Sequence, residues 1–203
     1  RGVLIMKQTQ RHISLRLKIL LIALIPLVSL GSVITIYSAL DSRQNIYAEK
    51  EASLSEMMDL AFSTIEYFYS LYQEGTLNES AAQAQALAIL REYRYGDTNS
   101  DYFWIQETVD NTPYMVMHPY SPELEGTDIS GIQDEDGMHI FVEFMKVANE
   151  QTEGYVDYNY QYYDEEGRIE PKRSIVRAHD EWDWIVGTGI YINDVRSTIT
   201  RQV

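Results

Sequence analysis

The chain contains no cysteine and only four histidines. Without cysteine it can form neither a disulfide framework nor a thiolate metal site, so zinc could be held only by histidine and carboxylate groups. No two histidines lie three to five residues apart, so the sequence offers no local pair of metal ligands. The motifs of serine hydrolases, P-loop NTPases and zinc proteases are also absent. We therefore expect no metal site, no cofactor and no catalytic activity.

The stretch "DEDG" at residues 134–137 resembles part of a calcium-binding loop. In the register of such a loop the first ligand position would be Ile132, whose side chain cannot coordinate a cation. We interpret the stretch as a turn before a helix.

Basic residues are scarce after residue 18, and their scarcity restricts the partners. The chain has 31 acidic residues, all of them after residue 18, against 16 lysines and arginines, and its formal net charge is −15. A domain with this much negative charge repels the phosphate backbone of nucleic acids. We therefore expect no nucleic-acid partner. A small anionic ligand would need locally placed cations, because the overall field opposes its approach.

The N-terminal region predicts a membrane anchor. Residues 1–18 carry five basic residues and no acidic one, and residues 19–40, "ILLIALIPLVSLGSVITIYSAL", carry no charge. As a helix this run would be about 33 Å long, enough to cross a hydrocarbon core of about 30 Å. It is too long for a cleaved signal peptide. The basic flank places residues 1–18 in the cytoplasm, residues 19–40 in the cell membrane as a transmembrane helix, and the remainder in the periplasm or outside the cell.

Residues 41–75 predict a long amphipathic helix that continues the membrane helix. The segment has no internal proline or glycine before Gly75. A helix of this length exceeds what a small domain covers, so we expect a homodimer that forms through it. Its apolar residues recur every three or four positions and form one stripe: Leu54, Met57, Ala61, Ile65, Phe68 and Tyr72.

A second helix and a sheet are predicted downstream. "TLNE" at residues 76–79 has the spacing of a capping box and opens a helix that runs to about Arg94. The apolar period then changes from 3.6 to 2, which indicates an antiparallel sheet of about five strands and hence an α+β fold. The strands are expected at 102–106, 114–118, 155–162, 172–178 and 184–191, with a short helix at 138–150.

Two aromatic strand faces are candidates for a binding site. Tyr102 and Trp104 alternate onto one face of their strand, as do Tyr158 and Tyr160 on theirs. Each of these faces could equally be ordinary hydrophobic core. The few cations near them are Arg94, at the end of the second helix, and Lys172, at the start of a strand. These cations are the groups that a bound anion would need.

Several ordered motifs resemble one family. "RYGDTNSDYFWIQ", "MVMHPYSPELEGTDIS" and "PKRSIVRAHDEWDWIVGTGIYINDV" are similar to the single Cache domain of the Cache_2 type, the extracytoplasmic sensor module of chemoreceptors and some sensor kinases. The resemblance covers about residues 41–194. It implies a PAS-like fold and a small carboxylate ligand of the acetate, propionate or pyruvate class. It also implies that residues 195–203 begin a linker to a second membrane helix, and we expect Met6 to be the natural start.

The resemblance also suggests a role for the histidine that ends the second strand. His118 would lie at the rim of the ligand cavity and donate a hydrogen bond to the ligand, aided by Lys172 or Arg94. The loop at residues 120–130 would fold over the cavity as a lid, with Pro119 ending the strand pairing. The alternative is that the His118 side chain only bonds to the loop backbone.

The function expected from the resemblance is that of a sensor domain in a transmembrane methyl-accepting chemotaxis receptor, which passes a helix shift across the membrane. The same module could serve a histidine kinase or a diguanylate cyclase. Alternatives of another class are a structural dimerisation stalk and a membrane-anchored enzyme.

Overall fold

The structure is a computed structural model that describes residues 15–194. Its contacts divide the chain after Asn45 into two units, and the second unit holds the sheet. Helix α1 (Leu15–Gln73) begins in the first unit and ends in the second. The predicted start at Met6, most of the predicted cytoplasmic segment and the predicted linker at 195–203 lie outside the described residues.

The membrane anchor predicted for residues 19–40 is not confirmed. Those residues lie within α1. Among the described residues, no helix meets the length and hydropathy needed to cross a bilayer.

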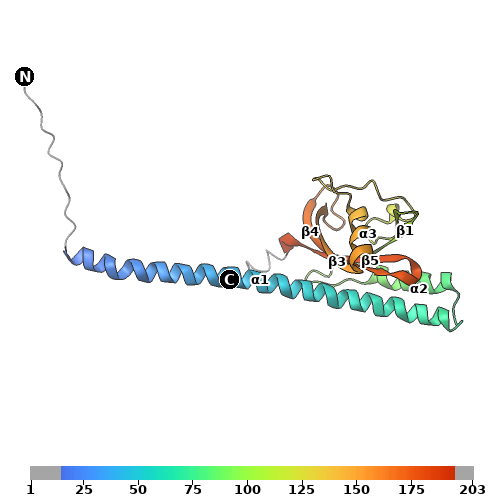
Figure 1. The fold of residues 1–203 in the computed structure, drawn as a ribbon, viewed down its shortest axis with the longest axis horizontal. Helices are drawn as coiled ribbons and strands as arrows, with labels where there is room; N and C mark the ends of the chain where they lie inside the picture. The colour runs from blue at the N-terminus through green and yellow to red at the C-terminus, as the bar shows by residue number, and fades with distance from the viewer. Residues whose placement is uncertain (1–14, 195–203) are drawn as a thin grey trace, which may run out of the picture. The chain divides into compact units, whose positions relative to one another are not determined.

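The α+β architecture is confirmed, and the sheet is antiparallel with five strands in the order β2-β1-β5-β4-β3 (Figure 1). Each predicted strand overlaps an observed one, since alternation of apolar and polar residues is a property of the local sequence. The predicted short helix corresponds to α3. The elements after α1 are α2 (Glu79–Glu92), β1 (Phe103–Val109), β2 (Thr112–Met117), the 3-10 helix η1 (Pro122–Leu124), α3 (Ile140–Gln151), β3 (Glu153–Gln161), β4 (Ile169–His179), the 3-10 helix η2 (Asp180–Trp182) and β5 (Trp184–Tyr191).

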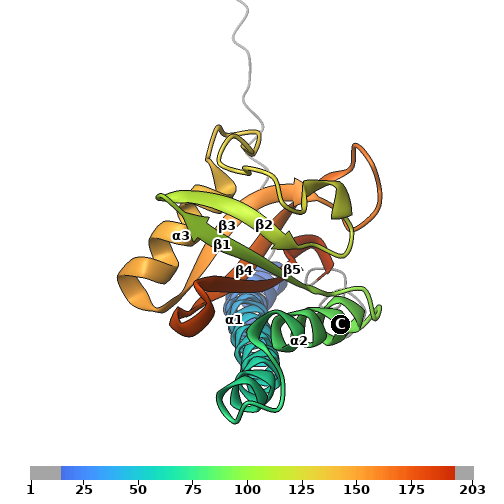
Figure 2. The same ribbon diagram turned by 90° about the vertical axis from the view of Figure 1, so that its right-hand side faces the viewer.

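Helices cover both faces of the sheet. The C-terminal part of α1 and α2 lie side by side on one face, and α3 lies on the other (Figure 2). Alternating residues of each strand feed the two layers: Ile175 of β4 packs on the α1 side, whereas its neighbour Val176 packs on the α3 side. Two separate hydrophobic cores result, one on each face of the sheet.

The apolar stripe of α1 belongs to the core of its own chain. Leu54, Ala61, Ile65 and Phe68 are buried in the cluster with the sheet and α2. These four residues are therefore not available to a partner chain, whereas Met57 and Tyr72 of the same stripe are only partly buried. Homodimer formation itself stays a prediction.

The start of α2 also differs from the prediction. The N-cap is Asn78, whose side-chain oxygen accepts the backbone N–H of Ala81 at 2.8 Å. Thr76 still belongs to the turn that closes α1, because its N–H bonds to the carbonyl of Leu71 after Gly75 adopts a φ of 72°. The capping box predicted at residues 76–79 therefore does not form.

Candidate functional site

Lys172 is fully buried on the α3 face of the sheet. Lys172 is 1% exposed. In the sheet it lies opposite Tyr158 of β3 and Tyr191 of β5. Its ammonium nitrogen Nζ donates a hydrogen bond of 2.9 Å to the hydroxyl of Tyr102. The side chain therefore reaches over β5, which separates β4 from β1 in the sheet.

Aromatic rings surround this ammonium. Nζ lies 4.2 Å from the ring centroid of Tyr102, 4.8 Å from that of Tyr191, 5.3 Å from that of Trp104 and 5.7 Å from that of Tyr160. These distances allow cation–π attraction from several faces at once. We call Lys172 and these four rings the aromatic cage.

A glycine on β5 makes room for one wall of the cage. A Cβ atom at Gly187 would lie 2.2 Å from Cζ2 of Trp104, so the indole ring can cross β5 only where no side chain stands. The neighbouring strand position on this face is also a glycine, Gly189, whose Cβ would lie 2.1 Å from Oγ of Ser174. The side chains of Trp104 and Ser174 can therefore lie against β5 only because Gly187 and Gly189 have no Cβ atom.

The charge of Lys172 is only partly compensated. Burial lowers the pKa of Lys172 to about 7, while Asp101 acts in the opposite direction. In the part of the chain that the structure describes, no carboxylate pairs directly with Nζ, whose one hydrogen bond goes to Tyr102. An anion that entered the cage would supply the missing partner.

Asp101 is the acid that acts on this charge, and Tyr163 donates a hydrogen bond to it. Its Oδ1 accepts a hydrogen bond of 2.7 Å from the hydroxyl of Tyr163. Burial raises the pKa of Asp101 to about 6, against the opposing effects of Tyr163 and Lys172. The carboxyl group therefore interacts with Lys172 through the field rather than by contact.

His118 lies directly after β2 and faces the cage. Its ring centroid is 5.1 Å from that of Tyr102 and 6.1 Å from that of Tyr160. Burial, and to a lesser degree the charge of Lys172, lower the pKa of His118 to about 3, so the imidazole is neutral at physiological pH. Among the residues that the structure describes, its buried Nδ1 has no hydrogen-bond partner. A polar atom left unpaired inside a protein is a position that a ligand atom can satisfy.

The loop after Pro119 packs over the cage. The ring of Tyr120 lies 4.9 Å from that of Tyr102. The carboxylate of Glu125 accepts the backbone N–H of His118 at 3.0 Å and pairs with both terminal nitrogens of Arg91 at 2.7 and 2.8 Å. The bidentate pair ties the loop to α2 and keeps it in position over the site.

Arg94 lies apart from the other predicted residues. Its Nη1 donates to the backbone carbonyls of Arg91 at 2.7 Å and Tyr93 at 2.8 Å, and its guanidinium carbon lies 5.1 Å from the ring centroid of Tyr120. Tyr120 therefore stands between Arg94 and the cage. The structure brings together the rest of the predicted set around one position: Tyr102, Trp104, His118, Tyr158, Tyr160 and Lys172.

Several residues of the site were not predicted from the sequence. Tyr191 could have been found, because it is the last residue of a predicted strand and lies on the same face as Lys172 once the strands are paired. Asp101, Tyr120 and Tyr163 carried no signal, since they lie in irregular segments of a chain rich in acids and tyrosines.

Comparison with known proteins identifies the family. The family model described as single Cache domain 2 matches residues 46–203. The chain belongs to the single Cache domain 2 family. This result and the five-stranded sheet confirm the predicted Cache fold, which is PAS-like, with its long N-terminal helix.

The most similar proteins include sensors of two kinds. The chain is 36% identical over 161 residues to the methyl-accepting chemotaxis protein McpP of Pseudomonas putida. This alignment covers 78% of this chain and 28% of McpP. It is 31% identical over 193 residues to the sensor histidine kinase MctS of Rhizobium johnstonii. That alignment covers 90% of this chain and 40% of MctS. The chain thus spans less than half the length of these relatives.

Solved structures agree with this assignment. A structure titled as the periplasmic sensor domain of a chemotaxis protein has a TM-score of 0.67 at 33% identity and covers 72% of this chain and 97% of its own. A Cache chemosensory domain whose title reports carboxylic acid recognition also has a TM-score of 0.67, at 32% identity, and covers 73% of this chain and 97% of its own.

Proposed function

We propose that this chain is the extracytoplasmic ligand-sensing part of a transmembrane chemoreceptor and that it binds a small carboxylate in the aromatic cage. The observation that carries the proposal is the Lys172 ammonium, which is buried among four aromatic rings and has no directly paired carboxylate in the described part of the chain. The solved Cache domain that recognises carboxylic acids supports the ligand class.

A buried ammonium without a counter-charge costs free energy, which here appears as the lowered pKa of Lys172. A bound carboxylate restores the pairing and stabilises the protonated lysine. The short apolar tail of acetate, propionate or pyruvate would contact the rings of Trp104 and Tyr160, which form the walls of the cage.

His118 would supply the second polar contact. The unpartnered Nδ1 can donate a hydrogen bond to a ligand oxygen in the tautomer that carries its proton there. A neutral imidazole adds this bond without a second buried positive charge. Arg94 would contribute at longer range, through the field and through its contact with Tyr120.

Strand β4 would carry the signal to α1. Lys172 points into the cage, and the next residue, Arg173, points to the opposite face, where its Nε lies 3.0 Å from Oε1 of Glu51 on α1. Arg177 makes a similar ion pair of 2.8 Å with Asp59. A small displacement of β4 on ligand binding would therefore be transmitted to α1.

The membrane and partner parts of the proposal rest on α1. The uncharged run at residues 19–40 would cross the membrane and transmit the shift, and α1 would pair with a second copy of the chain. Leu60 and Tyr67, which are 45% and 59% exposed, offer an apolar surface on α1 for that contact. Sedimentation should show a concentration-dependent dimer, and a monomer at every concentration would remove this part of the proposal.

A histidine kinase is the second candidate for the whole protein. The alignment with the kinase MctS covers more of this chain than the alignment with McpP does. The two candidates share the sensor and differ only in the output domain, so the ligand test applies to both.

A thermal-shift screen tests the proposed ligand class. A ligand that binds only the folded state stabilises it by about 2.7 kcal/mol at a hundredfold excess over Kd, which shifts the melting temperature by several degrees. We expect acetate, propionate or pyruvate to produce this shift, and expect propionamide and propylamine, which lack the carboxylate, to produce none. Stabilisation by the amide or the amine alone would show that the cage does not bind carboxylates.

A further inference from the structure

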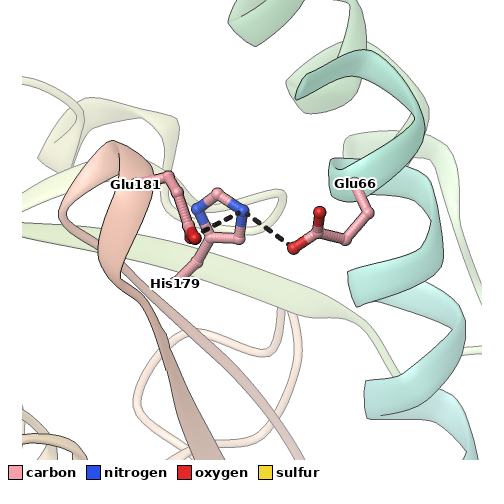
Figure 3. Close-up of side chains that lie close together, drawn as sticks. All are labelled: Glu66, His179 and Glu181. Carbon is pink, nitrogen blue, oxygen red and sulfur yellow. Dashed lines mark ion pairs between the residues drawn. The ribbon is translucent and has the colours of Figure 1, made fainter. Parts of the chain in front are cut away.

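We infer that Glu66, His179 and Glu181 form a binding site for a transition-metal cation such as Zn²⁺. Glu66 projects from α1, and His179 and Glu181 come from the end of β4 and from η2, so the three converge from segments far apart in the sequence (Figure 3). Their ligand atoms all lie within 4.8 Å of one another. The site is separate from the aromatic cage, because His179 and Lys172 lie on opposite faces of β4.

The distances suit one cation better than direct bonds between the side chains. Nε2 of His179 lies 3.4 Å from Oε1 of Glu66 and 3.6 Å from Oε2 of Glu181. Both separations exceed the usual length of a hydrogen bond between nitrogen and oxygen, about 2.7–3.2 Å. Two ligands on a tetrahedral zinc with bonds of about 2.0–2.1 Å are about 3.4 Å apart. A zinc ion near the centre of the three atoms would therefore need only small side-chain shifts.

The burial of His179 is the second observation. Its side chain is 1% exposed, and within residues 15–194 neither ring nitrogen has a hydrogen-bond partner. The rings of Phe62, Tyr69 and Trp182 surround the imidazole at centroid distances of 6.0, 5.8 and 5.4 Å. These rings fix the imidazole while Nε2 faces the two carboxylates (Figure 3). A buried nitrogen without a hydrogen bond lowers stability, and a cation coordinated by Nε2 would remove that cost for this atom.

The ligand set selects the class of metal. One imidazole nitrogen with two carboxylate oxygens suits zinc and its neighbours in the transition series, and a fourth position stays open to water. Calcium and magnesium prefer six or more oxygen ligands and bind imidazole poorly. Both glutamates are about half exposed, at 56% and 48%, so a cation can reach the site and the carboxylates can close on it.

Metal binding here would couple α1 to the sheet. Glu66 lies on the helix that carries the signal in the proposed function, whereas the other two ligands belong to the β4–η2 corner. A bound cation would cross-link the two and resist their relative movement. Zinc would therefore act on the sensor at a position that the carboxylate ligand does not touch.

The experiment titrates Zn²⁺ into the 203-residue chain, prepared in detergent without a histidine tag and stripped with a chelator. We expect one zinc ion per chain by calorimetry and a higher melting temperature, and no such change with Mg²⁺ or Ca²⁺. The variants Glu66→Gln and Glu181→Gln preserve side-chain size and should each lower the zinc affinity at least tenfold. Glu56→Gln removes the same charge from an exposed position on the same helix and should bind zinc like the unmodified chain.

The glutamate variants avoid the packing damage that replacement of the buried His179 would cause. X-ray absorption of the zinc-loaded chain should show a single imidazole ligand together with oxygen ligands. Unchanged zinc affinity in both Glu66→Gln and Glu181→Gln, or equal losses in Glu56→Gln, would overturn the inference. Neither result would affect the carboxylate proposal, since the cage residues are intact in all these variants.

Discussion

The ammonium of Lys172 lies 2.9 Å from the hydroxyl of Tyr102, although their segments are separated in the sheet by β5. This contact joins β4, which makes ion pairs with α1, to the segment that carries two of the four rings of the aromatic cage. The side chain of Lys172 extends over β5, whose next two positions on this face are Gly189 and Gly187. The ligand proposal depends on this arrangement.

Replacement of Lys172 by methionine should weaken carboxylate binding by roughly 2–5 kcal/mol, because the charge of the ligand would then be buried without a partner. Methionine fills a similar volume, so the unliganded protein should keep its stability or gain some. Titration calorimetry with propionate measures the first effect and urea denaturation the second. Arg94→Gln is the matched control, and a larger loss of affinity there than in Lys172→Met would assign the main role to Arg94.

Carboxylate affinity should fall as the pH rises above about 7. The unliganded lysine has a pKa of about 7, and only its protonated form pairs with an anion. Each unit of pH above this value should therefore cost up to a factor of about 10 in affinity, with one proton taken up on binding. Calorimetry in two buffers of different ionisation enthalpy measures that proton. Affinity that stays constant from pH 7 to pH 9 would contradict this prediction.

The stability of the unliganded protein should change in the opposite direction. Between pH 7 and the unperturbed lysine value of 10.5, the unfolded chain holds a proton that the folded chain has released, so the free energy of unfolding rises with pH. The expected slope is up to about 1.4 kcal/mol per pH unit. The shifted pKa values of Asp101, about 6, and His118, about 3, lie below this window. Urea denaturation at pH 7, 8 and 9 should show the slope in the wild type and not in Lys172→Met.

His118 should remain neutral throughout the physiological range. Its pKa is lowered to about 3 by burial, so its NMR ring signals should not titrate between pH 5 and pH 8. Replacement by phenylalanine removes the donor at nearly constant volume and should weaken propionate binding by about 1–3 kcal/mol. Full affinity in that variant would leave His118 a packing role only.

Gly187→Ala should destabilise the domain by about 1–3 kcal/mol. The added methyl group would overlap the indole of Trp104 and force the ring, and with it the cage, to move. Gly131→Ala is the control, because a Cβ atom there meets nothing within 4 Å. Urea denaturation should separate the two variants clearly. Equal stability would mean that Trp104 can leave β5 without cost.

Much of the fold could be predicted from the sequence, because the repeat of apolar residues along a helix or strand is a local property of the chain. The change of period from 3.6 to 2 located the strands and their two faces, so Tyr102 and Trp104 were correctly placed together, as were Tyr158 and Tyr160. The same pattern revealed the buried stripe of α1. It could not show that the chain's own sheet, rather than a second copy, covers that stripe.

The tertiary structure alone decided which charged groups meet. Lys172 and Arg94 were both candidates in the sequence. The strand order, with β5 between β1 and β4, placed Lys172 against Tyr102, while Arg94 ended behind Tyr120. The convergence of Glu66 with His179 was likewise hidden, since they are far apart in the sequence and lie on different elements. Periodicity records which face a residue occupies, whereas side-chain contacts across a sheet or between layers depend on how distant segments pack, and no local pattern specifies that packing.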